Sequence, residues 1–332
     1  MQPFAYHKVR DAETAIAHGA RDPQTIFLAG GTDLVQLLED GISRPQGVVD
    51  ISALPFDAIA TTIDGLRIGA LAKLADVADH AEIRARYPAI AAALGETASP
   101  MVRNMATMGG NLLQRTRCLY FRDGVSPCNK RAPGSGCSAR LGHDAQAALF
   151  GASEACVATH PSDLAVALLA LDAEVLVVGP SGERSIPLDR LHRLPGETPW
   201  IESDLEPGEV ITAIFVPREA AGRAQAYAKL RHRASFEWPL VSAAVSLALV
   251  EGTIEDARIA LGAVAHKPWR AETAERLLIG RRIDDALARE AGEAATDGAR
   301  PIAENAAKIP LMARIVTRAL QDCARQQAGD PS

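Results

Sequence analysis

The stretch TIFLAGGTDLVQLLEDG, residues 25–41, joins an apolar strand, two consecutive glycines and the start of a helix. Residues 25–29 favour a strand, and Thr32 or Asp33 is a candidate N-cap for a helix that Gly41 closes. Glycines let the backbone approach a ligand closely, and free amides at a helix N-terminus favour an anion such as a pyrophosphate. A tight structural turn explains a glycine pair equally well. The motifs GxGxxG and GxxxxGK[ST] are absent, which excludes the common dinucleotide and P-loop sites.

Four of the five cysteines, at positions 118, 128, 137 and 156, fall in one segment rich in Arg, Gly and Pro. This segment, residues 115–160, shows no sustained periodicity and is predicted to be an inserted loop. Nearby cations would offset the negative charge of an iron–sulfur cluster held by thiolates. A disulfide framework is typical of small secreted domains, which this chain does not resemble. No CxxC is present, so the spacing alone favours a metal centre and unrelated buried thiols equally.

A second glycine pair occurs in ATMGGN, residues 106–111, among similarly small and hydroxyl-bearing side chains. Two such segments could hold a diphosphate from opposite sides. Together with the cysteine segment, they favour a redox cofactor over two coincidental turns.

Short strands and helices alternate along the rest of the chain, and residues 217–222 are the best candidate for a linker between domains. Asp64-Gly65 predicts a hairpin. Strands are expected at 25–29, 47–51, 59–63, 66–70, 174–178, 210–216, 225–231, 241–250 and 253–264. Helices are expected at 12–18, 34–40, 76–94, 163–171, 271–278, 284–294 and 303–320. Asp11 is the predicted N-cap of the first of them and Ser162 that of the helix at 163–171.

Size and charge limit the function classes. A chain of 332 residues is expected to form two or three domains. Its net charge of −6 argues against nucleic-acid binding, which favours a basic surface. No apolar run approaches the roughly 20 residues of a membrane span. The first residues do not have the pattern of a signal peptide, although a folded subunit can be exported with a partner that carries one.

Several longer motifs resemble one family. AGGTDL at 29–34, ATMGGNLLQRTRC at 106–118 and HPSDLAVALLALDAEV at 160–175 resemble the FAD-binding subunits of the xanthine dehydrogenase family of molybdenum hydroxylases. The similarity continues through YAKLRHR at 227–233 and LGAVAHKPWRA at 261–271. The cysteine segment resembles a narrower subgroup with an extra [4Fe-4S] cluster on the flavin subunit, which includes periplasmic aldehyde oxidoreductases.

The resemblance implies an α+β fold of the vanillyl-alcohol-oxidase (PCMH) type. Two subdomains within residues 1–218 would hold FAD between them, and the [4Fe-4S] insertion would occupy residues 115–160. Residues 223–328 would form a C-terminal α+β domain of the CO dehydrogenase flavoprotein type.

The resemblance also implies the residues that hold each cofactor. Asp163 would contact the adenosine part of FAD and Lys229 would lie beside its flavin end. One side of the pyrophosphate would be lined by Phe27, Leu28, Ala29, Gly30, Gly31, Thr32, Asp33 and Leu34, and the other by Thr107, Gly109, Gly110 and Asn111. The cluster ligands would be Cys118, Cys128, Cys137 and Cys156. For His160 and His266, packing or helix capping is favoured over metal ligation.

A role in electron transfer follows from the resemblance. A large molybdenum-cofactor subunit would oxidise an aldehyde or heterocycle, and a small subunit with two [2Fe-2S] clusters would relay the electrons. The FAD of this chain would pass them to an external acceptor, with no catalytic acid–base pair required. Export with a signal-bearing partner would place the complex in the periplasm, with the cytoplasm as the alternative. The extra cluster would be a redox centre or a structural staple, with a slight preference for the latter.

Two other functions compete with electron transfer. A stand-alone flavin oxidase of the same fold usually needs a cap domain, for which roughly 110 residues after the linker leave little space. A scaffold with a structural zinc would usually show a CxxC knuckle, which is missing.

Overall fold

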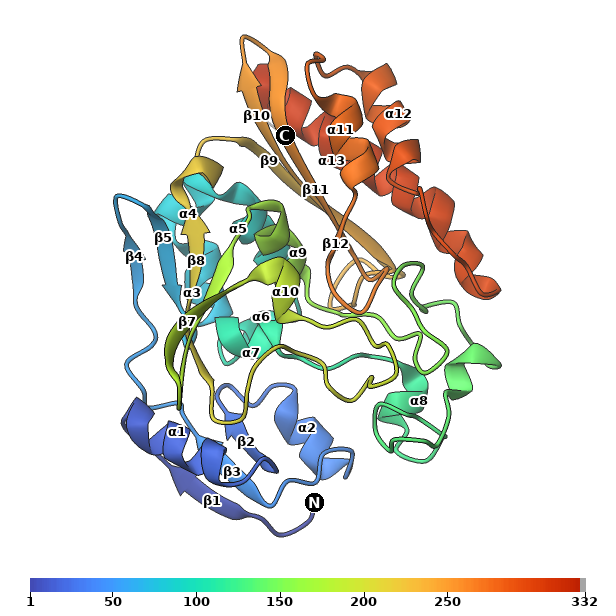
Figure 1. Cartoon of the computed structure of the whole chain (residues 1–332). Helices are drawn as coiled ribbons and strands as arrows, with labels where there is room; N and C mark the ends of the chain where they lie inside the picture. Colours follow the sequence, from blue (N-terminus) through green and yellow to red (C-terminus); the bar gives the residue numbers. More distant parts are fainter. Residues whose placement is uncertain (329–332) are drawn as a thin grey trace.

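Three sheets organise the described part of the chain, residues 1–328, in the computed structural model (Figure 1). The first is a parallel sheet in the order β1-β3-β2, drawn in blue at the bottom of Figure 1. Its strands are β1 (Ala5–Lys8), β2 (Thr25–Leu28) and β3 (Gly47–Asp50), and its helices are α1 (Ala12–Arg21) and α2 (Leu34–Glu39). Asp11 caps α1 as predicted, because its carboxylate accepts the Thr14 N–H at 2.8 Å.

The second sheet is antiparallel and has the order β4-β5-β8-β6-β7. Its strands are β4 (Ile59–Thr61), β5 (Gly65–Gly69), β6 (Glu174–Gly179), β7 (Gly182–Pro187) and β8 (Val210–Pro217). The helices of this unit are α3 (Leu74–Asp79), α4 (Ala81–Arg86), α5 (Pro88–Gly95), α6 (Pro100–Arg103), α7 (Met108–Leu112), α9 (Asp163–Ala170) and α10 (Leu188–Leu191). Every residue of α9 is buried, as expected for a helix that is apolar on all sides.

The third sheet is antiparallel, in the order β12-β11-β10-β9, and lies at the upper right of Figure 1. Its strands are β9 (Ala224–Leu230), β10 (Val241–Val250), β11 (Thr253–Gly262) and β12 (Trp269–Arg270). Three helices pack on one face of it, namely α11 (Glu272–Leu278), α12 (Asp285–Ala294) and α13 (Lys308–Ala328). The α+β class and the C-terminal domain are therefore as expected.

The structure differs from the expected elements at two places. The expected helix at 76–94 is three helices. His80 has an extended backbone between α3 and α4, and Pro88 starts α5 after Tyr87, whose backbone is also non-helical. Strand β7 was missed because five of its six residues are exposed and show no apolar alternation. The expected linker, residues 217–222, lies between β8 and the strand at Ala224–Leu230, and it contains a short 3-10 turn, η2 (Arg218–Ala220), in which Ala220 is buried.

The cysteine segment is mostly irregular, as predicted, and Figure 1 shows it in green beside the C-terminal unit. It contains only a short helix, α8 (Leu119–Arg122), and a 3-10 turn, η1 (Ser138–Arg140). Its later part is tied to the C-terminal unit, since Asp144 accepts the N–H groups of Ala303 and Glu304 at 2.9 and 2.8 Å. The insertion therefore bridges the two halves of the chain.

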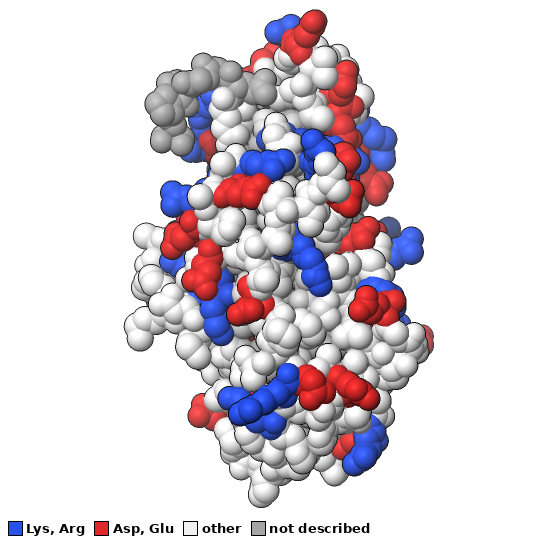
Figure 2. All heavy atoms as spheres, turned by 90° about the vertical axis from the view of Figure 1, so that its left-hand side faces the viewer, with Lys and Arg blue, Asp and Glu red and all other residues white. Residues whose placement is uncertain are grey.

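The surface mixes both signs of charge. On the face in Figure 2, acidic and basic side chains are interspersed, so no field of one sign extends over a wide area of it. Among residues 1–328, no helix combines the length and apolarity needed to cross a membrane.

Lys308 at the start of α13 is buried, and its ammonium donates to the Ala147 carbonyl of the insertion at 3.0 Å and to the Ala263 carbonyl. Burial lowers the pKa of Lys308 from 10.5 to about 7. Between these pH values the unfolded chain binds more protons than the folded one. The free energy of unfolding should therefore rise with pH in this window, by at most about 1.4 kcal/mol per pH unit. The hydrogen bonds to the two carbonyls favour the charged form of Lys308 and therefore make the rise of the unfolding free energy with pH smaller.

The slope is measured by urea unfolding at pH 7, 8 and 9 for the natural chain and for Lys308→Met. We expect Lys308→Met to show the smaller rise. Equal slopes for the two proteins would contradict the assignment to Lys308.

Candidate cofactor site

The two glycine segments meet in the structure. A β-carbon added at Gly30 would lie 2.2 Å from the carbonyl oxygen of Met105, so only glycine permits this approach without a backbone shift. Gly31 has φ +73°, a conformation that glycine adopts at little cost. Lys73, which no sequence motif indicated, pairs with Thr107 in an isolated β-bridge. Its ammonium donates a hydrogen bond to the same Met105 carbonyl at 3.2 Å. A cation therefore stands beside the predicted pyrophosphate segments.

Helix α7 presents the second segment. Thr107 is its N-cap, with its hydroxyl accepting the Gly110 N–H at 3.3 Å. Ser162, which also caps α9 as predicted, donates to the side-chain oxygen of Asn111 at 2.6 Å. This hydrogen bond fixes the Asn111 amide so that its nitrogen, a donor, points away from Ser162. Gly109 lies against Ala70, where an added β-carbon would approach the Ala70 side chain to 3.2 Å.

Asp33 connects the first segment to the insertion. Asp33 stands at the N-cap position of α2, one of the two positions expected for the cap, but its side chain makes no capping hydrogen bond. Its carboxylate instead accepts the backbone N–H of Arg115 at 2.9 Å and pairs with Arg117 at 2.7 Å and Arg122 at 2.8 Å. The Arg117 guanidinium lies 4.4 Å from the ring centre of Trp238, and burial lowers its pKa to about 10 although Asp33 opposes this.

The other predicted residues of the first segment are half-buried. Phe27 and Ala29 pack against the small core of the first sheet, which includes Val49. Leu28 pairs with β3, and its carbonyl accepts the Ile51 N–H at 2.9 Å. Thr32 and Leu34 flank Asp33 at the start of α2. Within this segment, Gly30, Gly31 and Asp33 make the contacts that shape the site.

Asp163 and Lys229 form a buried ion pair, with 2.7 Å between the carboxylate and the ammonium and side-chain exposures of 3% and 1%. Tyr227 and Thr97 also donate to the carboxylate, at 2.5 and 3.3 Å. Burial raises the pKa of Asp163, and the Lys229 charge opposes that shift. The expected roles, with Asp163 at the adenosine part of FAD and Lys229 beside its flavin end, stay predictions. The structure adds that the two side chains form one ion pair.

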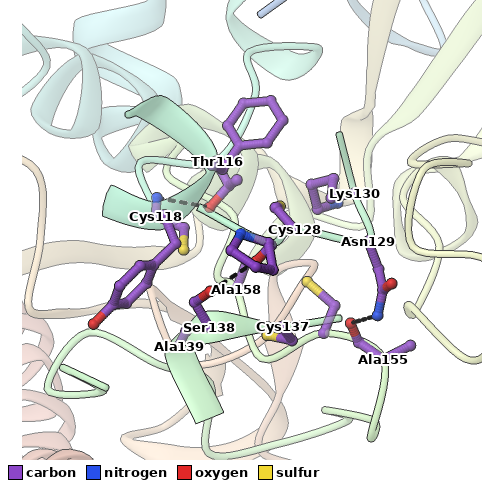
Figure 3. Close-up of a pocket in the computed structure, with 14 residues that line it drawn as sticks. Thr116, Cys118, Cys128, Asn129, Lys130, Cys137, Ser138, Ala139, Ala155 and Ala158 are labelled. Carbon is purple, nitrogen blue, oxygen red and sulfur yellow. Dashed lines mark hydrogen bonds between the residues drawn. The ribbon is translucent and has the colours of Figure 1, made fainter. Parts of the chain in front are cut away.

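The four cysteines of the insertion line one pocket, and Figure 3 shows Cys118, Cys128 and Cys137 around it. Cys128 and Cys137 face each other in an isolated antiparallel bridge. Cys156 comes from the far end of the insertion and shares a hydrogen bond with Cys137 that lowers the pKa of Cys137 to about 6. All four thiols are free. The four cysteines therefore come together in the fold, although their spacing in the sequence matches no metal-binding motif.

Four free thiols around one pocket are the donor set that a cubane would use, with one thiolate at each iron. Among the described residues, no three His, Cys, Asp or Glu side chains stand close enough to hold one metal ion. Tetrahedral zinc draws each sulfur to about 2.3 Å from one ion, whereas a cubane binds each thiolate at a different iron and spaces the sulfurs more widely. The hydrogen bond with Cys137 and burial raise the pKa of Cys156, and the positive charge of Lys130, which is 5% exposed and lines the same pocket, opposes this shift.

Two buried histidines hold the end of α7. The Nε2 atoms of His160 and His192 lie 3.1 and 2.8 Å from the Leu112 carbonyl oxygen. Because a carbonyl only accepts, both rings must carry the proton on Nε2. Burial lowers the pKa of His192 to about 4 and that of His160 well below its usual value, so both are neutral near pH 7. His160 thus has the packing role that was favoured for it.

A second pocket, of about 150 Å³, opens between the insertion and the C-terminal unit. Arg117 and Leu119 line it from one side, and Trp238, Pro239 and Ala263 from the other. Trp238 and Pro239 thus border the insertion.

Comparison with known proteins identifies the family of both parts of the chain. Residues 2–219 match the family model described as the FAD binding domain in molybdopterin dehydrogenase, and residues 225–323 match the CO dehydrogenase flavoprotein C-terminal domain. The chain is 44% identical, over 99% of its length and 100% of the relative, to the aldehyde oxidoreductase FAD-binding subunit PaoB of Escherichia coli K12. It is 27% identical to the carbon monoxide dehydrogenase medium chain of Hydrogenophaga pseudoflava, with 96% of each chain covered.

Solved structures extend the similarity to the whole fold. The carbon monoxide dehydrogenase of Hydrogenophaga pseudoflava superimposes with a TM-score of 0.76 at 26% identity, covering 97% of this chain and 98% of that one. Quinoline 2-oxidoreductase from Pseudomonas putida 86 gives the same TM-score at 24% identity, with 99% of both chains covered.

Proposed function

Because the chain belongs to the family of FAD-binding subunits of molybdopterin dehydrogenases, we propose that it transfers electrons through FAD in an aldehyde-oxidising molybdenum enzyme. FAD binding and membership of an oxidoreductase follow from the family, and the aldehyde substrate rests on the similarity to PaoB. The observation that carries the proposal is the contact of the two glycine segments at Gly30 and Met105. It brings the amides, small side chains and Lys73 that a pyrophosphate needs to one place.

FAD would lie against Gly30, Gly31, Thr107, Gly110 and Asn111. When bound, it supplies two-electron redox chemistry and passes the electrons to an external acceptor. The buried ion pair of Asp163 and Lys229 would act at one point of the cofactor, where its fixed polarity orients the bound group.

A [4Fe-4S] cluster on Cys118, Cys128, Cys137 and Cys156 is the finer part of this proposal. The convergence of four free thiols on one pocket supports it, together with the buried ammonium of Lys130. The cluster would supply one-electron redox chemistry, and it would also hold together a segment that has little regular structure of its own.

Partner subunits, compartment and domain limits complete the proposal. The chain would assemble with a large molybdenum-cofactor subunit and a small subunit that carries two [2Fe-2S] clusters. It would be exported to the periplasm with a partner that bears the signal. The flavin domain would comprise residues 1–218, and the C-terminal domain residues 223–328.

The first test is the visible spectrum of the chain purified without oxygen, with iron, acid-labile sulfide and released flavin measured on the same sample. Flavin bands over a broad iron–sulfur shoulder, with about four irons per FAD, are expected for one cubane and one flavin. Flavin without iron would refute the cluster and retain the FAD role. A folded sample with neither cofactor would refute the whole proposal.

Cys128→Ser should remove the iron and leave FAD bound, because a cubane loses one of its four thiolates while the glycine segments stay intact. Iron per FAD is expected to fall from about four to less than one. Cys323→Ser is the matched control, since Cys323 is fully buried in the C-terminal core and donates to the Ala224 carbonyl at 3.6 Å. It should retain both cofactors. Full iron content in Cys128→Ser would contradict the ligand assignment.

A further inference from the structure

One residue of the C-terminal unit reaches the cysteine pocket of the insertion. His266 lies between β11 and β12, and its Nε2 atom is 3.3 Å from the Sγ atom of Cys156. The side chain is 8% exposed, so this contact is shielded from water. The other ring nitrogen, Nδ1, is buried and has no hydrogen-bond partner within residues 1–328. The contact with Cys156 is therefore the one polar interaction that the described structure provides for this ring.

The direction of the hydrogen bond follows from the chemistry of the sulfur. A thiolate bound to iron carries no proton and can only accept, so the ring must donate. A neutral imidazole has a single N–H, and it gains a partner only when that proton is on Nε2. His266 in this tautomer is a donor directed at the sulfur of Cys156.

The backbone holds this donor in place. The carbonyl of Ala265, the preceding residue, accepts the His160 N–H at 2.9 Å, and the carbonyl of Val264 accepts the N–H groups of Leu149 and Phe150 at 2.7 and 3.0 Å. These bonds join the segment before His266 to both flanks of Cys156 in the chain. These hydrogen bonds hold the backbone on both sides of the contact and so keep the His266 ring beside the sulfur of Cys156.

We propose that His266 donates a hydrogen bond to the Cys156 thiolate and thereby raises the reduction potential of the iron–sulfur centre. The inference rests on the proposed cluster. A reduced cluster carries one more negative charge than an oxidised one, so a donor to its sulfur stabilises the reduced form more. The C-terminal domain would then tune a centre whose ligands all belong to the other half of the chain.

The test is an EPR-monitored redox titration of His266→Leu and His266→Gln beside the natural chain, with iron, sulfide and FAD measured on each sample. In His266→Leu the equilibrium constant for cluster reduction should fall about tenfold, which is about 59 mV for a one-electron couple. His266→Gln keeps an amide donor and should recover part of this shift. The flavin potential should be the same in all three proteins. An unchanged cluster potential in His266→Leu, with iron retained, would overturn the inference.

A measurement on the natural chain covers the case in which both variants lose iron. Pulsed EPR of the reduced protein labelled with ¹⁵N-histidine should show one weakly coupled histidine nitrogen. A strong coupling would mean direct ligation, and no coupling would mean no hydrogen bond; either result overturns the inference. Absence of iron from the natural chain would instead refute the cluster itself, so the two failures are distinguishable.

Discussion

Gly30→Ala will weaken FAD binding by about tenfold to a hundredfold. The new methyl group would lie 2.2 Å from the Met105 carbonyl oxygen and 3.0 Å from its carbon, and both are backbone atoms. Lys73 and the bridge to Thr107 hold this backbone from the other side. Overpacking of this kind costs about 1–3 kcal/mol, and part of that cost will be met by moving the two glycine segments apart. The measurement is the dissociation constant of FAD from the reconstituted apoprotein.

Gly95→Ala is the matched control for this substitution. Gly95 ends helix α5, and an added β-carbon there would meet nothing within 4 Å. Alanine in a helix is favoured over glycine by about 0.5–1 kcal/mol, so this variant should bind FAD normally and be at least as stable. If Gly30→Ala binds FAD as tightly as Gly95→Ala does, the contact at Met105 does not shape the cofactor site.

Lys229→Met should lower the free energy of unfolding by about 3–5 kcal/mol, because it leaves the Asp163 carboxylate buried without its counterion. The hydrogen bonds from Tyr227 and Thr97 remain but carry no charge. Urea unfolding of the apoprotein measures this cost separately from any effect of FAD. In the double variant Lys229→Met/Asp163→Asn, part of the stability should return since no isolated charge remains.

Arg276→Met controls for the loss of a cation that is paired but exposed. Arg276 and Glu272 are about 70% exposed and 3.5 Å apart, so removing Arg276 should cost less than about 0.5 kcal/mol. Similar losses in Arg276→Met and Lys229→Met would show that burial does not govern the Asp163 pair.

The elements predicted correctly are those encoded by neighbouring residues. The caps Asp11 and Ser162 each bind an N–H three residues ahead, and Asp64-Gly65 closes a hairpin between β4 and β5. Such contacts depend on spacing along the chain, which the sequence displays directly. The glycine segments were recognisable for the same reason. The sequence predicted that the two segments could hold a diphosphate from opposite sides. It did not predict the contact between Gly30 and Met105.

The errors concern side chains whose partners are distant in the chain. Asp33 has the residue type and position of an N-cap, yet its carboxylate binds arginines more than 80 residues away. Asp163 and Lys229 touch although 66 residues separate them, and no spacing in the sequence indicated this ion pair. Nothing near His266 indicated that it would meet Cys156, 110 residues earlier. Charge complementarity and shape decide such contacts, and neither has a fixed period in the sequence.

The contacts of Asp33 have a consequence for protein engineering. The insertion is not a cassette that can be moved alone between related flavin subunits, since Arg117 and Arg122 would arrive without the carboxylate that pairs with them. Removing the insertion would equally leave the Asp33 carboxylate without its counterions. A successful graft has to carry position 33 together with residues 115–160, which makes one residue of the flavin loop part of the inserted module.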